Sequence, residues 1–148
     1  FWSIKRNRRL QQKRRQNEGQ RMKYIIDTSA WIEYLNGSKS GESVNKILKE
    51  DNEIYVISLI ISEVISKVKR KAGNVDLAYD CLIKNSRIFD ITPKISKRIG
   101  ILHAQIKNKL PNFSLADASI VCSAETINAK IVTKDTHFKG FKETILIK

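Results

Sequence analysis

A short apolar run that ends in an aspartate constrains the fold of this chain more than any other feature. Residues 24–26 are Tyr-Ile-Ile, and an apolar run without alternation is typical of a strand buried on both faces, as in a parallel sheet. Trp31, Ile32 and Leu35 follow at helical spacing, which predicts a helix directly after Asp27. The carboxyl edge of an open α/β sheet is where ligands bind, so Asp27 is a candidate functional residue. Alternatively, Asp27 only caps the helix, because Asp is a favoured N-cap residue.

Short β-rich runs alternate with helical patterns along the rest of the chain. Apart from 24–26, strands are predicted at 54–57, 87–91, 130–133 and 144–147. Helices are predicted at 28–35, 43–48, 58–71, 75–84, 93–109 and 114–127. This alternation predicts the α/β class, with a parallel sheet covered by helices on both faces.

Two of these helices have distinct local signals. Thr92 followed by Pro93 is a helix start, with a cap residue and then proline at the first helical position. Ser58 is predicted to cap the helix at 58–71. The buried stripe of that helix is expected to comprise Ile61, Val64, Ile65 and Val68.

Positive charge is concentrated at the N-terminus. The chain has 148 residues, the length of one domain, and a net charge of +13. Residues 1–21 hold eight basic side chains and one acidic side chain, so they carry +7 and residues 22–148 carry +6. The basic balance of residues 22–148 favours a polyanionic partner such as nucleic acid, although a solvated basic surface has the same composition.

The first 21 residues are expected to lie outside the folded domain, which we assign to 22–148. After Leu10 they hold almost no apolar side chains, so burial would not offset the entropy cost of ordering them. They could be a nucleic-acid-binding arm, a cloning remnant, or sequence translated ahead of a start at Met22, the only methionine. We prefer the last interpretation because Met22 directly precedes the first strand.

Composition also bears on the compartment. Cys81 and Cys122 fall in predicted helices without metal-ligand spacing, which is typical of small buried residues in a reducing compartment. No apolar run approaches the length of a membrane span, and no secretory signal is recognisable. We therefore expect a cytoplasmic protein with no membrane partner.

The sequence lacks the motifs of several common enzyme classes. Neither G-x-G-x-x-G nor G-x-x-x-x-G-K occurs, so nucleotide-cofactor functions lose their main support. There is no G-x-S-x-G elbow, and His103 and His137 have no evident nucleophile partner. We expect His103 to be a solvated flank residue and His137 to be structural or peripheral.

Four carboxylates fall at or near the predicted carboxyl edge of the sheet. Asp27 ends the first strand, and Glu63 lies early in the helix after the second. Asp117 begins the most apolar helix, and Asp135 follows the fourth strand. Each has a structural alternative: Glu63 could be a surface charge, Asp117 could form a capping box with Ser114, and Asp135 could be a turn residue.

Together these acids are consistent with one chemistry. Carboxylate oxygens suit Mg²⁺ or Mn²⁺, which retain waters and bridge to substrate phosphates. One or two such ions could activate water and stabilise the leaving oxygen of a phosphodiester displacement. The ions would also offset the mutual repulsion of the acids. Lys and Arg side chains around the cleft would hold the phosphate backbone.

The ordered set of motifs resembles the PIN-domain ribonucleases, and especially the VapC-type toxins of toxin–antitoxin pairs. The motifs are IIDTS at 25–29, SLIISEV at 58–64, LADA at 115–118 and IVTKDTHF at 131–138. The resemblance covers nearly all of 22–148, and the tail at 1–21 departs from it. It implies a three-layer α/β/α sandwich whose central parallel sheet has four or five strands.

The resemblance also implies an activity and partners. The expected activity is that of a Mg²⁺- or Mn²⁺-dependent endoribonuclease selective for single strands, acting as a homodimer. For a toxin, it implies a small antitoxin that inserts a segment near the active site. A PIN nuclease that matures RNA without an antitoxin, and a catalytically inactive nucleic-acid-binding module, remain alternatives.

Carried over residue by residue, the resemblance assigns both catalytic and metal-binding roles to the four carboxylates. Asp27 and Asp117 are the expected direct metal ligands, and hydroxyl groups are expected to orient the acids. The acids are Asp27, Glu63, Asp117 and Asp135, and the hydroxyl residues are Thr28, Ser29 and Thr133.

Overall fold

Five parallel strands form one sheet in the computed structural model, which describes residues 21–141 and 143–148. The order across the sheet is β3-β2-β1-β4-β5, which places β1 at its centre. The strands are β1 (Lys23–Ile26), β2 (Glu53–Val56), β3 (Arg87–Ile88), β4 (Lys130–Thr133) and β5 (Thr144–Leu146). The prediction of a parallel sheet with four or five strands is therefore confirmed.

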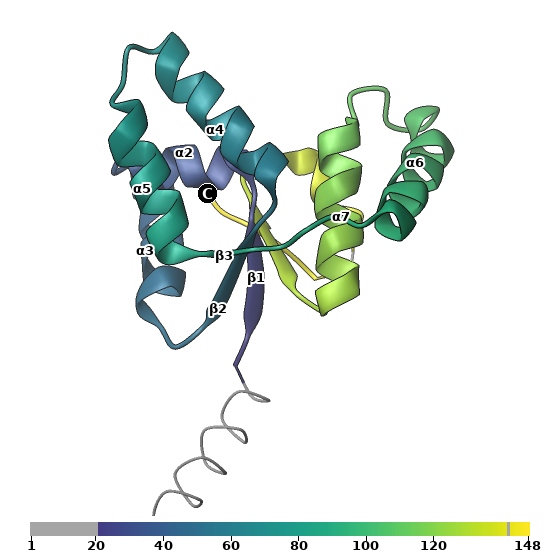
Figure 1. Ribbon diagram of the computed structural model, residues 1–148, viewed down its shortest axis with the longest axis horizontal. Coiled ribbons are helices and arrows are strands. Elements are labelled where there is room, and N and C mark those ends of the chain that lie inside the picture. The colour runs from purple at the N-terminus through teal and green to yellow at the C-terminus, as the bar shows by residue number, and fades with distance from the viewer. Residues whose placement is uncertain (1–20, 142) are drawn as a thin grey trace, which may run out of the picture.

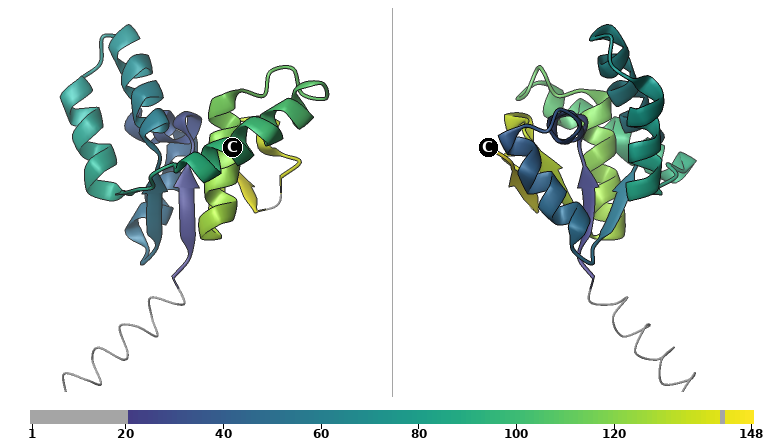
Figure 2. Two further views of the ribbon diagram at one scale, coloured as in Figure 1. Left: turned by 45° about the vertical axis from the view of Figure 1, so that its right-hand side comes forward. Right: turned by 90° about the vertical axis from the view of Figure 1, so that its left-hand side faces the viewer.

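Helices connect the strands and cover the sheet. They are α2 (Thr28–Leu35), α3 (Lys39–Lys49), α4 (Ser58–Arg70), α5 (Val75–Asn85), α6 (Pro93–Lys107) and α7 (Leu115–Ile127), with one 3-10 turn, η1 (Thr136–Phe138). Helices α2 to α5 gather on the left of Figure 1, and α6 and α7 lie on the right. The left-hand view in Figure 2 shows the same separation of the two groups of helices. The predicted α/β/α sandwich is confirmed.

The core lies between the central strands and the helices that pack on them. Ile25 and Ile26 of β1 are fully buried, as expected for a central strand covered on both faces. Trp31 of α2 is also fully buried. Helix α7 buries every residue from 118 to 124 and packs on β1 and β4, as its nearly uniform apolar composition predicted.

Two predicted elements differ from the structure by more than two residues at one end. The helix predicted at 43–48 begins four residues earlier, at Lys39, because Ser38 accepts a hydrogen bond from the Gly41 N–H and caps it. The strand predicted at 87–91 has only two residues, both exposed. Strand β3 lies at the edge of the sheet, where short strands are common because they limit unwanted pairing.

Two details of α4 also differ from the prediction. Ser58 is the first helical residue rather than the cap, and the N-cap position belongs to Ile57. The buried stripe is rotated by part of a turn, because Ile60 and Val64 are the buried residues and Ile65 is only half-buried. The neighbouring residues 61 and 68 are half-buried against the core.

The N-terminal region is described from Arg21 onward. Arg21 forms an ion pair with Asp51, and the rest of the predicted extension, residues 1–20, lies outside the described residues. Within the described part of the chain, no helix combines the length and apolar character needed to cross a membrane.

Candidate metal centre and its hydroxyl network

The pairing of the two central strands sets the position of Asp27. Ile26 of β1 is paired with Val132 of β4, and the Asp27 N–H donates to the Val132 carbonyl at 2.8 Å. Asp27 therefore lies beside Thr133 at the carboxyl end of both strands. Figure 1 shows α2 starting at this end of β1. Asp27 occupies the N-cap position of α2, and its carbonyl accepts the Trp31 N–H at 3.0 Å, but its side chain makes no capping hydrogen bond. The position predicted for a helix cap is therefore confirmed, but capping is not what the carboxylate does.

Two hydroxyl groups hold the Asp27 carboxylate. Ser29 Oγ donates to Asp27 Oδ2 at 2.9 Å, and Thr133 Oγ1 donates to the same oxygen at 2.8 Å. Each hydroxyl also accepts a backbone N–H, from Lys134 to Ser29 at 3.0 Å and from Asp135 to Thr133 at 2.9 Å. Because an ionised carboxylate oxygen can only accept hydrogen bonds, both hydroxyl groups donate to Asp27, and the two N–H groups hold the hydroxyl oxygens in place. The chain after β4 thus fixes the orientation of a carboxylate on β1.

The Asp27 carboxylate lies in an unfavourable environment for a negative charge. Its residue is 6% exposed, and burial raises its pKa above the ordinary value. The hydrogen bonds from Thr133 and Ser29 lower the pKa, and the negative charge of Asp117 raises it further. Among residues 21–141 and 143–148, no Lys, Arg or His nitrogen lies within 4.0 Å of this carboxylate.

Asp117 is held at the start of α7 by a reciprocal cap. The Ser114 N–H donates to Asp117 Oδ2 at 2.8 Å, and the Asp117 N–H donates to Ser114 Oγ at 3.0 Å. This is the capping box that the sequence predicted as the structural alternative. The side chain is half-buried, and its charge acts on Asp27. The cap therefore fixes Asp117 where its charge reaches Asp27, and the structural and electrostatic roles coexist.

Glu63 is joined to the same edge through Thr28. Thr28 Oγ1 donates to Glu63 Oε2 at 2.6 Å, which links the start of α2 to the second turn of α4. Thr28 is buried and Glu63 is half-buried. Thr28 follows Asp27 directly in the chain, so its hydroxyl fixes the glutamate near the first acid. The predicted orienting roles of Thr28, Ser29 and Thr133 are thus consistent with the hydrogen bonds they make.

Asp135 differs from the other three acids. Its Oδ1 accepts the His137 N–H at 2.9 Å, which caps the η1 turn, and lies 3.1 Å from His137 Nδ1. The carboxylate therefore has a turn role, as one alternative predicted. In addition, the Asp135 N–H supports Thr133, so this residue already stabilises the Asp27 network through its backbone.

Comparison with known families identifies the fold of this site. The family model described as the PIN domain matches residues 24–143, a range that includes all four acids. The chain belongs to the PIN domain family. No curated protein matches the chain at a significant level of similarity.

Solved structures share the fold of this PIN domain at low sequence identity. VapBC2 from Rickettsia felis, bound to a promoter DNA fragment, matches with a TM-score of 0.66 and 23% identity over 84% of this chain and 97% of that chain. A toxin–antitoxin complex from Klebsiella pneumoniae has a TM-score of 0.65 and 20% identity, covering 82% and 95% of the two chains. Mycobacterium tuberculosis VapC20, described as a Sarcin-Ricin loop cleaving toxin, has a TM-score of 0.65 and 14% identity, covering 81% and 97%.

The acids of this PIN domain are suited to a hard divalent cation. Asp27 is a buried carboxylate without a cationic partner among the described residues, and Asp117 is a second carboxylate whose negative charge acts on it. A Mg²⁺ or Mn²⁺ ion would offset both charges and accept their oxygen ligands. In the described part of the chain, no three Asp, Glu, His or Cys side chains already stand close enough to enclose an ion. The four-acid ligand set therefore stays a prediction.

Sequence reasoning missed the connection from this site to Lys134 and Glu33. The Lys134 N–H supports Ser29, and Lys134 Nζ forms an ion pair with Glu33 Oε1 at 2.9 Å. Ser38 Oγ also donates to Glu33 Oε2, and these contacts lower the pKa of Glu33. The position of Lys134 directly after the fourth strand was the available signal. Glu33 gave none, because a lone glutamate near the end of a short helix has the pattern of an ordinary surface charge.

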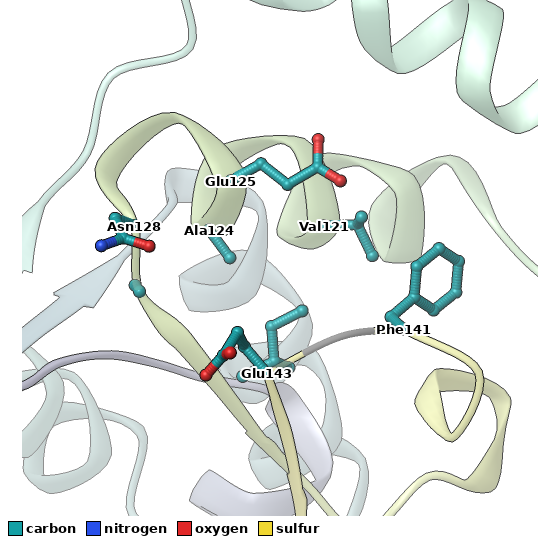
Figure 3. A pocket seen from close by; sticks show the side chains of 8 residues that line it. Val121, Ala124, Glu125, Asn128, Phe141 and Glu143 are labelled. Atoms are coloured by element: carbon teal, nitrogen blue, oxygen red, sulfur yellow. The ribbon is translucent and has the colours of Figure 1, made fainter.

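A separate hollow lies at the opposite end of the sheet (Figure 3). It is formed where α7 ends at Asn128 and β4 begins, and Glu125 and Glu143 line it together with apolar side chains. None of the four predicted acids lines this hollow. It is therefore distinct from the candidate metal centre.

Proposed function

We propose that this PIN-domain protein is a Mg²⁺- or Mn²⁺-dependent endoribonuclease that acts as the toxin of a type II toxin–antitoxin pair. The observation that carries the proposal is the buried Asp27 carboxylate, oriented by Ser29 and Thr133 and close to the charge of Asp117. Such an arrangement is stable at neutral pH when a cation offsets the charges. The likeness to VapBC complexes and to a Sarcin-Ricin loop cleaving toxin supports RNA cleavage by a toxin.

Each residue of the site has a role in this proposal. Asp27 and Asp117 would hold the metal, and Glu63 and Asp135 would complete the acidic site. A bound Mg²⁺ or Mn²⁺ would supply Lewis acidity and lower the pKa of a water molecule. The hydroxyls of Ser29 and Thr133 keep Asp27 in one orientation, so little reorganisation is required when RNA binds.

The fixed positions of the acidic side chains would determine which phosphodiester of a bound RNA lies at the site. Thr28 holds Glu63 on one side of Asp27, and the Ser114 cap holds Asp117 near Asp27. A phosphate at this edge of the sheet would thus meet fixed acidic groups. The net positive charge of residues 22–148 would attract the polyanionic substrate to this edge.

The proposed partners follow from the same comparison. We infer a small antitoxin as the protein partner, because the Rickettsia felis and Salmonella typhimurium structures are DNA-bound VapBC complexes. A homodimer in the cytoplasm is part of the same proposal. Co-purification from a strain that retains the neighbouring genes, followed by mass measurement of the intact complex, tests both the antitoxin and the dimer.

The test of activity compares the parent protein with Asp27→Asn and Asp117→Asn on single-stranded RNA with Mg²⁺ or Mn²⁺. We expect metal-dependent cleavage by the parent and losses beyond the ~10–100-fold that removal of a ligand's hydrogen-bond partner costs. Asp80→Asn, an exposed charge of α5, is the matched control and should cleave normally. Equal cleavage by all four proteins would exclude the proposed site.

Expression in bacterial cells separates the toxin from its alternatives. A toxin should arrest growth, the arrest should require Asp27, and co-expression of the antitoxin should relieve it. RNA cleavage without growth arrest would favour a PIN nuclease of RNA maturation. RNA binding without metal-dependent cleavage would favour an inactive nucleic-acid-binding module.

A further inference from the structure

A basic groove runs between α2 and α4 beside the candidate metal centre. Its first part is lined by residues of α2, the end of α4 and the turn after β4, and its second part is lined by α4 alone. Lys67 and Arg70 line both parts, so the two form one continuous surface. The full lining is Ser29, Ile32, Glu33, Ser62, Glu63, Ser66, Lys67, Arg70, Lys71 and Lys134.

Both parts of the groove reach the acidic site. Ser29 lines the first part and donates to Asp27 Oδ2 at 2.9 Å. Glu63 lines the second part and accepts from Thr28, the residue after Asp27. A chain lying in the groove would therefore pass directly beside the candidate metal centre.

The groove holds positive charge that the protein leaves free for a ligand. Within residues 21–141 and 143–148, no carboxylate oxygen lies within 4.0 Å of the charged nitrogens of Lys67, Arg70 or Lys71. The fourth basic residue, Lys134, is paired with Glu33. Glu33 thus forms an ion pair with one of the four cations of the groove, and it also lies within electrostatic range of Lys71.

We propose that this groove binds the phosphate backbone of the RNA strand that flanks the scissile phosphodiester, a step that rests on the proposed function. Lys67, Arg70 and Lys71 form the contact surface. Lys134 contributes to RNA binding only when its ion pair with Glu33 is broken. Free cations beside a hydrolytic site suit a polyanion that must extend past the reacting bond.

The lining also defines what the groove recognises. Ile32 is its only apolar residue, and no aromatic side chain lines it. Protein partners are usually anchored by buried apolar or aromatic side chains, so the groove is poorly built for an antitoxin segment. Without stacking surfaces, it contacts phosphates and not bases. Sequence preference therefore originates outside this groove.

The experiment measures binding of a fluorescent single-stranded oligoribonucleotide of about 12 nucleotides to the full chain in EDTA, where metal-dependent cleavage is absent. We expect Lys67→Ala/Arg70→Ala to weaken binding on the order of tenfold and to reduce the slope of log K against log salt by about 1.4. The loss should be the same for two unrelated sequences. Glu33→Gln should strengthen binding, because it frees Lys134.

The matched control is Lys94→Ala/Lys97→Ala, which removes two exposed charges from α6 on the other side of the molecule (Figure 1). It should bind nearly as well as the parent, and circular dichroism should show that every variant folds. Equal weakening by both double variants, or none by Lys67→Ala/Arg70→Ala, would overturn the proposal. If Lys67→Ala/Arg70→Ala still binds RNA but no longer binds a poly-glutamate probe, the proposal is overturned and the groove is assigned to an acidic protein segment.

Failure of this proposal is distinguishable from failure of the proposed function. If the parent cleaves RNA but Lys67→Ala/Arg70→Ala binds normally, only the groove is wrongly assigned. If no protein cleaves RNA but this double variant loses RNA binding, the assignment of the groove is supported and the proposed nuclease activity is refuted.

Discussion

Thr133 donates a hydrogen bond of 2.8 Å to Asp27, although the two residues are 106 positions apart in the chain. The pairing of β1 with β4 brings them side by side, and the Asp135 N–H donates a hydrogen bond to the threonine hydroxyl oxygen. Thr133 is fully buried and Asp27 is nearly so. The orientation of the central acid therefore depends on the pairing of β1 with β4, in addition to the local hydrogen bond from Ser29.

The first prediction concerns this hydroxyl. Thr133→Val keeps the shape of the side chain but removes one of the two hydroxyl groups that donate to the Asp27 carboxylate, and it leaves the Asp135 N–H without its hydroxyl partner. We expect a loss of about 1–3 kcal/mol in the free energy of unfolding, measured in urea, because unsatisfied buried polar groups are costly. Thr133→Ser retains the hydroxyl and is the control. If serine, which lacks the methyl group, destabilises the protein and valine, which lacks the hydroxyl, does not, then methyl packing and not the hydrogen bond is responsible.

The second prediction follows from the raised pKa of Asp27. The pKa of the Asp27 carboxyl group is higher in the folded protein than in the unfolded chain, where it is about 3.9. The contribution of this group to stability is therefore fully present below the unfolded pKa and is lost as the pH rises through the folded pKa. The Asp27→Asn variant does not lose stability in this way, because asparagine does not ionise. Without metal, it should therefore be more stable than the parent at neutral pH, by about 2–4 °C in Tm if the difference is about 1 kcal/mol.

Thermal melts of both proteins from neutral pH down to about pH 4 check the sign. The advantage of Asp27→Asn should shrink as the pH falls, because the parent's carboxyl becomes protonated. Asp80→Asn controls for the change in net charge. An advantage that grows in acid would mean that the folded state favours the charged form of Asp27.

The third prediction is that divalent cations stabilise the folded protein through Asp27 and Asp117. Mn²⁺ at 100 times its Kd should raise the free energy of unfolding of the parent by about 2.7 kcal/mol. Asp27→Asn and Asp117→Asn should lose most of this gain, and Asp80→Asn should keep it. The readout is Tm, so it does not depend on cleavage. A shift of equal size in all four proteins would indicate binding elsewhere.

The sequence was sufficient to predict the fold because its local signals agree with one another. The apolar run at 24–26, the cap at Thr92-Pro93 and the helix α7, rich in apolar and small residues, all have the structure that their patterns predict. The errors lie where tertiary contacts decide. Strand β3 is shorter than predicted because only the edge of the sheet is available to it, and α3 is longer because Ser38 caps it.

The candidate site was only partly predictable for a related reason. Element boundaries indicated the four acids, since strand ends are visible in the sequence. The backbone N–H groups of Lys134 and Asp135 that support the hydroxyls are not, because every residue has one. The basic groove was missed as well. Lys67, Arg70 and Lys71 lie at or just after the end of α4, where basic residues are common because they complement the helix dipole.

The last prediction concerns the close crossing of α2 and α3, which supports Glu33 at the edge of the groove. Gly41 is buried against the backbone of α2, and a Cβ at this position would contact the Glu33 carbonyl oxygen and lie 2.8 Å from Tyr34 Cα. Backbone atoms cannot move aside cheaply, so Gly41→Ala should force the helices apart. We expect a loss of about 1–3 kcal/mol in the free energy of unfolding, measured in urea.

Gly100→Ala is the matched control for Gly41→Ala. Gly100 lies within α6, and nothing would come within 4 Å of a Cβ there. Alanine is the better helix former, so Gly100→Ala should stabilise the protein by about 0.5–1 kcal/mol. The two substitutions are chemically identical and should have opposite signs, because only Gly41 faces another helix at short range. If both substitutions stabilise the protein, α2 and α3 are far enough apart to accommodate a methyl group at position 41, which contradicts the prediction.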